Sequence, residues 1–154
     1  MTRDATPLTD RPGFLIRRLH QIHLALFAEE CGAFGVTPVQ YSLLTVLAAQ
    51  PGLDQAGLGH EIGVDRATLT HVVRRLEARA LLARSRDPAD RRSKRVTLTE
   101  RGATLLARMD EAAERAHRRT IEALPPERQA AFLNELRRLV EAGNDYGRAP
   151  LRLT

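Results

Sequence analysis

The chain has 154 residues, enough for one domain with a hydrophobic core. A single cysteine excludes an intrachain disulfide, and no apolar run approaches the roughly 18 residues of a membrane span. Aromatic residues make up 4% of the chain and tryptophan is absent, so base-stacking platforms for single-stranded nucleic acid are not expected. The polar N-terminus lacks a signal-peptide pattern, and we expect a cytoplasmic protein without membrane association.

Two helices are predicted before residue 51. Residues up to about Asp10 should form a flexible leader, and Asp10 before Arg11 and Pro12 is the expected entry to the first helix. Apolar side chains then recur at spacings of three and four residues, which predicts a helix within residues 11–34. They are Phe14, Leu15, Leu19, Ile22, Leu26 and Phe27. Thr37 and Pro38 suit the N-cap and first position of a second helix, which Pro51 and Gly52 end.

The next two helices form a helix-turn-helix pattern. Asp54 is the expected N-cap of a short helix that ends near Gly63, and Asp65 is the expected N-cap of the helix that follows. The latter buries an apolar stripe at helical spacing, formed by Leu69, Val72, Val73 and Leu76. Its other faces are polar and basic, which is typical of a helix that contacts DNA.

The period of the pattern changes after this helix. Residues 82–86 and 95–98 are short alternating runs on either side of Asp87-Pro88-Ala89-Asp90, which predicts a β-hairpin with a basic loop. Residues 66–95 contain ten basic and three acidic side chains, a net charge of +7, whereas the whole chain carries +5. Positive charge gathered on one compact segment indicates a polyanion partner.

Two further helices complete the chain. One should run from Thr99 to about Ala123, with small residues in the middle of its apolar stripe, and the other from Pro126 to about Gly143. The expected fold class is mainly α with a small β-hairpin wing. The small side chains Ala112, Ala113 and Ala116 would permit close helix packing, either within one subunit or between two.

Three stretches together resemble the MarR-type bacterial regulators. They are TPVQYSLLTVLA, DQAGLGHEIGVDRATLTHVVRRLEAR and DPADRRSKRVTLTERG. The resemblance implies one domain over residues 1–154, with a winged helix-turn-helix lobe at 37–99 flanked by dimerisation helices at 11–34 and 100–143, and hence a homodimer on a pseudo-palindromic operator. The family usually has glycine directly after the recognition helix, where this chain has Ala80.

The same resemblance assigns roles in binding double-stranded DNA. Early residues of the recognition helix would meet base edges, namely Arg66, Thr68, Thr70 and His71. Phosphate contacts would come from Arg74, Arg75, Arg86, Arg91 and Lys94. In the wing, Arg92 would enter an A·T-rich minor groove and Asp90 would orient it through a charge-assisted pair.

Such regulators often respond to small aromatic acids, and the first helix is similar to that of regulators of aromatic-acid and nicotinate catabolism. A ligand of this class, for example a hydroxylated nicotinate, would release the repressor from its operator. The guanidinium of an arginine pairs with a carboxylate, and a neutral histidine hydrogen-bonds to a ring substituent. The candidate ligand residues are Arg17, Arg18, His20, His23 and Tyr41; the alternative is that the arginines are surface residues and His20 packs at the dimer interface.

Other functions remain alternatives. Thiol-based redox sensing would use Cys31, although the nearby Glu29 and Glu30 disfavour a thiolate. A basic helical dimer binding an acidic protein is the second alternative, and it leaves the basic hairpin unexplained. A metal site from His20, His23 and Cys31 is a further alternative, since the two histidines have a metal-ligand spacing. The remaining ligands are unassigned, so we expect neither a metal nor a cofactor. No phosphate-binding loop or catalytic triad pattern is present, and no enzyme activity is expected.

Overall fold

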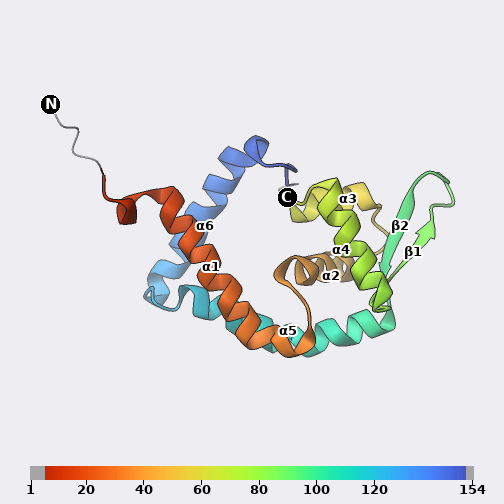
Figure 1. Ribbon diagram of the computed structural model, residues 1–154, viewed down its shortest axis with the longest axis horizontal. Coiled ribbons are helices and arrows are strands. Elements are labelled where there is room, and N and C mark those ends of the chain that lie inside the picture. Colours follow the sequence, from red (N-terminus) through yellow and green to blue (C-terminus); the bar gives the residue numbers. More distant parts are fainter. Residues whose placement is uncertain (1–5, 152–154) are drawn as a thin grey trace.

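The computed structural model describes residues 6–151, which form six α-helices and one two-stranded antiparallel sheet (Figure 1). The elements are α1 (Pro12–Cys31), α2 (Pro38–Ala49), α3 (Gln55–Ile62), α4 (Arg66–Ala78), β1 (Leu82–Arg86), β2 (Lys94–Leu98), α5 (Glu100–Ile121) and α6 (Pro126–Gly143). The predicted fold class is confirmed. Within these residues no single helix is long and apolar enough to cross a membrane; only Pro12–Phe34 and Pro38–Ala49 together, bent by 66°, reach that length and composition.

The predicted caps of α2, α3 and α4 are confirmed by their hydrogen bonds. Thr37 and Gln40 form a capping box, in which the Gln40 N–H donates to the Thr37 hydroxyl at 3.3 Å and the Thr37 N–H donates to Gln40 Oε1 at 3.0 Å. Asp54 Oδ1 accepts from the Gly57 N–H at 2.7 Å, and Asp65 Oδ1 accepts from the Thr68 N–H at 3.0 Å. These bonds satisfy amide groups that a helix start otherwise leaves unpaired.

The start of α1 differs from the prediction. Arg11, rather than Asp10, occupies the N-cap position, and no side chain caps the helix there. Leu8–Asp10 form a 3-10 turn where a flexible leader was expected. The remainder of that predicted leader, residues 1–5, lies outside the described residues. The helix nonetheless begins at Pro12. Backbone N–H groups in the first turn have no acceptor within the helix, so proline, which lacks an N–H, is well tolerated there.

The hydrophobic core lies between α2, α3, α4 and the hairpin and continues along the contact of α1 with α5 (Figure 1). Leucines fill the first part, among them Leu43, Leu44 and Leu76, each 0% exposed. Ala113 and Ala116 of α5 are also 0% exposed. Because they are buried within one protomer, where α1 packs against α5, the small residues of α5 serve close packing inside the subunit.

The hairpin is joined to the helical core at its base. In its register Leu82 faces Leu98 and Arg86 faces Lys94. The fully buried Val96 also donates its N–H to the Leu53 carbonyl at 2.9 Å, just before α3. The wing therefore has a fixed root and a projecting tip, as Figure 1 shows at the upper right.

The segment that follows α6 returns to the helix-turn-helix formed by α3 and α4. The Asn144 side chain donates from Nδ2 to the Leu151 carbonyl and accepts at Oδ1 from the Leu151 N–H, both at 2.8 Å. The Pro150 carbonyl lies 3.3 Å from His60 Nδ1, and the Leu151 side chain packs beside Gly63 in the α3–α4 turn. Residues 144–151, which we call the C-terminal tether, thus link the end of α6 to the turn before the recognition helix (Figure 1).

Ala80 adopts the left-handed conformation, with φ 55°, that favours glycine. The Leu81 N–H donates to the Leu76 carbonyl at 3.0 Å and the Ala80 N–H donates to the Glu77 carbonyl at 2.8 Å. This pair of bonds is a Schellman motif, which ends α4 and turns the chain into β1. The geometry typical of glycine is therefore kept although the residue is alanine.

Ala80→Gly should raise the free energy of unfolding by about 1 kcal/mol, because glycine removes the steric cost of positive φ at this position. Urea denaturation at a fixed protein concentration measures the change. Ala78→Gly, two residues earlier inside α4, is the matched control and should lower stability by about 1 kcal/mol. A loss of stability in both variants would contradict the proposed cost at Ala80.

Candidate DNA-binding surface and effector site

The recognition helix α4 separates an apolar face from a basic one. Its four buried residues are those of the predicted stripe, Leu69, Val72, Val73 and Leu76. The opposite side is exposed and carries five of the predicted DNA-contact residues, namely Arg66, Thr68, His71, Arg74 and Arg75. Packing of the apolar face on the core therefore holds these five side chains outward along one surface.

Thr70 does not belong to that surface. Its side chain is half-buried, its hydroxyl donates to the Arg66 carbonyl at 2.8 Å, and it accepts from Gln55 Nε2 at 2.8 Å. The predicted base contact by Thr70 is thus corrected to a contact between α3 and α4. Gln55 was missed, since a residue in the first turn of α3 gives no sign of its tertiary partner. The Thr68 hydroxyl is also engaged and donates to Asp65 Oδ2 at 2.9 Å.

The wing tip is shaped by two aspartates. Asp87 Oδ2 accepts from Arg95 Nε at 2.8 Å, and Asp90 Oδ1 accepts from the backbone N–H of Arg92 at 2.9 Å. No ion pair joins the side chains of Asp90 and Arg92, both of which the structure describes. The predicted orientation of the Arg92 guanidinium by Asp90 is therefore wrong: Asp90 orders the backbone of the turn, and the guanidinium remains exposed.

Two acidic side chains near the α4 and wing surface are neutralised by ion pairs with arginines. The Glu77 carboxylate accepts from Arg84 Nε at 2.9 Å, and hydrogen bonds from Arg84 hold the pKa of Glu77 below its ordinary value. The hydrogen bond from Arg95 likewise lowers the pKa of Asp87. Both acids are therefore ionised and already paired at neutral pH.

The predicted phosphate-contacting side chains are free of such pairs. Within residues 6–151 no carboxylate lies within 4.0 Å of the charged groups of Arg74, Arg75, Arg86, Arg91 or Lys94. All five are exposed. Their charge is therefore available to a polyanion on the α4 and wing surface.

A second candidate site is an aromatic cluster where α1, α2 and α5 meet. It consists of His23, Phe27, Tyr41 and His117. The rings of His23 and His117 stack with their centroids 5.1 Å apart, and the rings of Phe27 and Tyr41 lie 5.8 Å apart. The structure thus brings together two of the predicted ligand residues, His23 and Tyr41, and adds His117, which sequence reasoning missed. The sequence signal for His117 was its position directly after Ala116, which belongs to the apolar stripe predicted for this helix.

The remaining predicted ligand residues line the more N-terminal turns of α1. The Arg17 guanidinium lies 5.3 Å from the centroid of the Phe14 ring, and Arg18 donates to Gln21 Oε1 at 2.8 Å. Both arginines and His20 are exposed. The structure does not bring the two arginines into contact with the aromatic cluster.

His23 is the half-buried histidine of the cluster. Its Nδ1 lies 2.9 Å from the Thr120 hydroxyl oxygen, and that hydroxyl donates its own hydrogen to the Ala116 carbonyl at 2.8 Å. Because the hydroxyl hydrogen is used in that bond, we assign the ring proton of His23 to Nδ1, which donates to the Thr120 oxygen. Burial, reinforced by the positive charge that His117 and His20 can carry, lowers the pKa of His23, so the neutral ring presents Nε2 as an acceptor.

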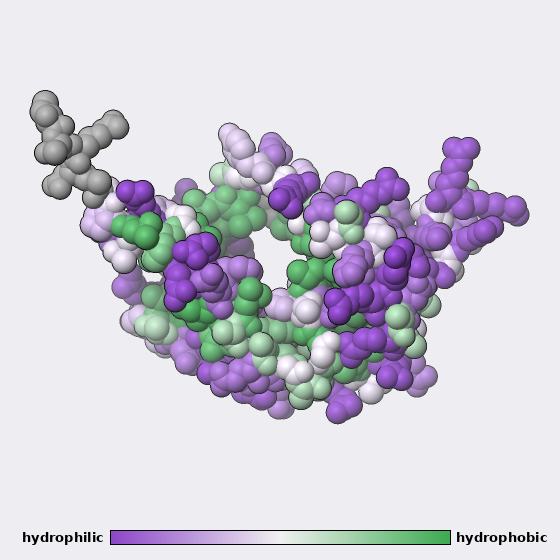
Figure 2. Space-filling model, viewed as in Figure 1, coloured by the Kyte–Doolittle hydropathy of each residue, from purple (hydrophilic) through white to green (hydrophobic). Residues whose placement is uncertain are grey.

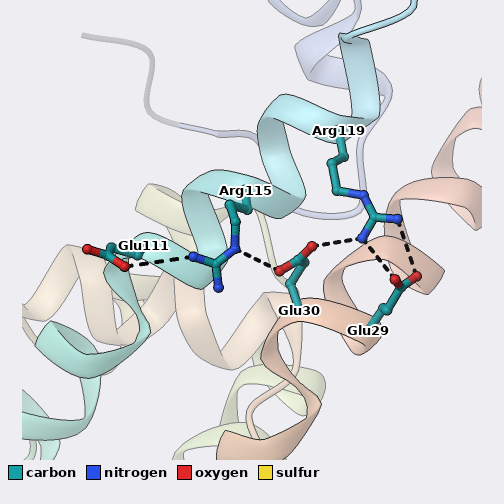
Figure 3. Close-up of polar contacts among 5 residues, drawn as sticks. All are labelled: Glu29, Glu30, Glu111, Arg115 and Arg119. Carbon is teal, nitrogen blue, oxygen red and sulfur yellow. Dashed lines mark hydrogen bonds and ion pairs between the residues drawn. The ribbon is translucent and has the colours of Figure 1, made fainter.

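An ion-pair network fixes the end of α1 against α5 beside this cluster (Figure 3). Glu30 accepts from Arg115 Nε at 2.9 Å and from an Arg119 nitrogen at 2.7 Å, and Arg119 also reaches Glu29 at 3.1 Å. Hydrogen bonds from Arg115 and Arg119 hold the pKa of Glu30 below its ordinary value of 4.5.

Glu30→Gln should flatten the acid side of the stability profile. Because the pKa of Glu30 is lower in the folded than in the unfolded protein, its contribution is present above pH 4.5 and is lost as pH falls through the folded pKa. The variant should be less stable at neutral pH and depend less on pH between about pH 5 and about pH 3, measured by urea denaturation. Glu111→Gln is the control, since Glu111 is 92% exposed and lies 3.8 Å from Arg115. Equal profiles for Glu30→Gln and the wild type would refute this role.

Cys31 is unsuited to redox sensing. It is 0% exposed, and burial, reinforced by the negative charge of Glu30, raises the pKa of its thiol. A thiol that is both inaccessible and protonated reacts slowly with oxidants. Within the described residues, no group of three or more potential ligands could hold a metal ion, so His20, His23 and Cys31 do not converge on one.

A basic recognition helix and a basic wing on one helix-turn-helix core define a winged helix-turn-helix DNA-binding protein. A sequence model of the MarR family matches residues 36–94. The repressor NicR of Pseudomonas putida is 34% identical over 146 residues, which cover 94% of this chain and 92% of NicR. The chain belongs to the MarR family and is a DNA-binding transcriptional regulator.

Two solved structures extend the likeness to the whole fold. PcaV from Streptomyces coelicolor, in complex with its natural ligand, is 35% identical with a TM-score of 0.81 and covers 92% of this chain and 99% of its own. BpsR of Bordetella bronchiseptica, solved to explain how 6-hydroxynicotinic acid regulates its DNA binding, is 34% identical with a TM-score of 0.84. That match covers 88% of this chain and 96% of BpsR.

Proposed function

We propose that this chain is a homodimeric repressor that a small aromatic carboxylate, such as a hydroxylated nicotinate, releases from its operator. The aromatic cluster at the junction of α1, α2 and α5 is the observation that best supports a small-molecule effector. It combines three other rings with one half-buried, neutral imidazole, that of His23. The role is regulation by binding, without catalysis and without a cofactor.

The chemistry of the cluster suits such a ligand. Its rings give an aromatic ligand faces for stacking, and His23 Nε2 accepts a hydrogen bond from a ring hydroxyl. The carboxylate would pair with a guanidinium from the preceding turns of α1, where Arg17 and Arg18 lie and where His20 adds a polar group. The similarity to BpsR, whose DNA binding is regulated by 6-hydroxynicotinic acid, supports this ligand class.

The dimer is supported by apolar surface that one protomer leaves uncovered. Every residue of α6, all within the described range, is at least partly exposed, and Leu139 and Val140 are 65% and 48% exposed. Ile16 and Ile22 of α1 are 59% and 46% exposed. Figure 2 shows hydrophobic side chains gathered around the opening between these helices and the DNA-binding lobe. An isologous dimer would bury this surface and pair two recognition helices for a pseudo-palindrome.

A ligand titration tests the effector. 6-Hydroxynicotinic acid should raise the melting temperature of the protein and release it from the DNA upstream of its own gene in a gel shift. His117→Ala should weaken both effects about tenfold or more, because it removes one of the stacked rings. Arg118→Ala, which removes the exposed neighbour of His117 outside the cluster, is the control. If neither this acid nor related benzoates alter melting or DNA binding, the proposed ligand class is incorrect.

The wing has a separate test. Arg92→Ala should weaken binding about tenfold to operators with A·T-rich flanks and less to G·C-rich ones, because a narrow minor groove concentrates negative potential. Arg91→Ala, the neighbouring exposed residue, should weaken both kinds of site alike. Fluorescence anisotropy with the two labelled duplexes measures the difference. Equal losses for Arg92→Ala on both duplexes would rule out its minor-groove role.

A further inference from the structure

A groove with a volume of about 510 Å³ lies at the root of the wing, between the last turn of α4 and the first turns of α5. Three arginines, Arg79, Arg101 and Arg108, line it together with Leu81 and Leu105. Leu81 is 2% exposed and Leu105 is half-buried, so the groove has an apolar floor beneath charged walls. The aromatic cluster differs, because its members are two histidines, a tyrosine and a phenylalanine and include no arginine.

The groove carries unneutralised positive charge. Among residues 6–151, no carboxylate lies within 4.0 Å of the three guanidinium groups, whereas Arg84, Arg95 and Arg115 all have such partners. The single acid in the lining is the exposed Glu100. The lining therefore has a net charge of +2 and guanidinium donors that fit carboxylate or phosphate oxygens.

Two of the guanidiniums are held in place by neutral groups. Arg79 donates to the Gly35 carbonyl at 2.6 Å and to the Phe34 carbonyl at 3.0 Å, and Arg108 lies 6.0 Å from the centroid of the Phe34 ring. A guanidinium has five N–H donors, so Arg79 keeps others for a ligand. Because these side chains are already restrained, binding an anion costs little additional side-chain entropy.

The groove is distinct from the DNA-contact surface. It lies where β1 begins and α5 starts, whereas Asp90–Arg92 form the opposite end of the hairpin. It is also lined by the C-terminal end of α4, while Arg66 and Thr68 lie in the first turn. We infer that this groove binds a small organic dianion, with carboxylate or phosphate groups on a compact apolar body.

Calorimetric titration of DNA-free protein with phthalate tests the site. We expect saturable binding that Arg101→Ala/Arg108→Ala weakens at least tenfold, and that Arg137→Ala/Arg138→Ala, two exposed arginines of α6, leaves unchanged. Inorganic phosphate should bind more weakly than phthalate, because it cannot use Leu81 and Leu105. Circular dichroism confirms that each variant is folded.

Three outcomes would overturn the inference. The first is the absence of saturable phthalate binding, and the second is an equal loss in both double variants. The third is loss of phthalate binding in His117→Ala, which would place the ligand in the aromatic cluster. If Arg101→Ala/Arg108→Ala weakens DNA binding as much as loss of Arg74 and Arg75 does, the arginines serve DNA phosphates and the inference also fails.

Discussion

Gly102→Ala should destabilise the protein by about 3 kcal/mol or more, because the first turn of α5 leaves no room for a side chain. A Cβ atom at this position would overlap the Leu81 carbonyl oxygen and lie 2.8 Å from Leu98 Cδ1. The Leu81 backbone cannot retreat cheaply, since its N–H is bonded to Leu76 and its carbonyl accepts from the Thr99 N–H at 3.2 Å. The substitution therefore separates α5 from the root of the wing.

Gly13→Ala is the matched control for this substitution. Gly13 also lies in a helix, but an added Cβ there has nothing within 4 Å, so the change should alter stability by less than about 1 kcal/mol. Urea denaturation of both variants at one protein concentration gives the comparison. Similar stabilities for the two variants would show that the contact between α5 and Leu81 is unimportant.

Operator affinity should fall steeply with salt. The five predicted phosphate-contacting cations of a subunit are exposed and lack carboxylate partners among residues 6–151. A dimer in which each subunit uses three to five of them would make about six to ten phosphate contacts. The logarithm of the binding constant should then fall with the logarithm of salt concentration with a slope between about −5 and about −9, a loss of about 10³-fold to 10⁵-fold between about 50 and 200 mM. Fluorescence anisotropy over that range measures the slope.

Arg75→Ala tests the assignment of this slope to the α4 surface. Removing one phosphate contact from each subunit should reduce the slope by about 1.8 and weaken binding to all duplex sequences alike. Arg138→Ala, an exposed arginine of α6, should leave the slope unchanged. Affinity that is flat from low to high salt would contradict the whole electrostatic account, and a sequence-selective loss would make Arg75 a base-reading residue.

The sequence predicted most of the fold because its elements carry local signals. Thr37, Asp54 and Asp65 cap helices through bonds within four residues, and the stripe of Leu69, Val72, Val73 and Leu76 follows the helical period. The hairpin was evident from the change of period after residue 81. Arg11 at the start of α1 differs from the prediction, since a helix that begins at proline does not require a side-chain cap.

Site details were predicted less well because they depend on contacts distant in sequence. Thr70 contacts Gln55 from another helix, and His117 contacts His23, which lies 94 positions earlier in the sequence. A local sequence pattern does not predict side-chain contacts between residues that are far apart in the chain. The incorrect prediction for Asp90 has a different origin. Asp90 and Arg92 are two positions apart, and the carboxylate accepts from the backbone N–H of Arg92 instead of from its guanidinium.

The C-terminal tether gives the lobe an asymmetric freedom of movement. The lobe is attached along α5 on one side, and residues 144–151 hold the α3–α4 turn on the other. Rotation about α5 that carries the turn away from α6 must break the contacts of Pro150 and Leu151, whereas the reverse rotation keeps them. The tether therefore resists rotation of the α3–α4 turn away from α6 and leaves the opposite rotation unopposed.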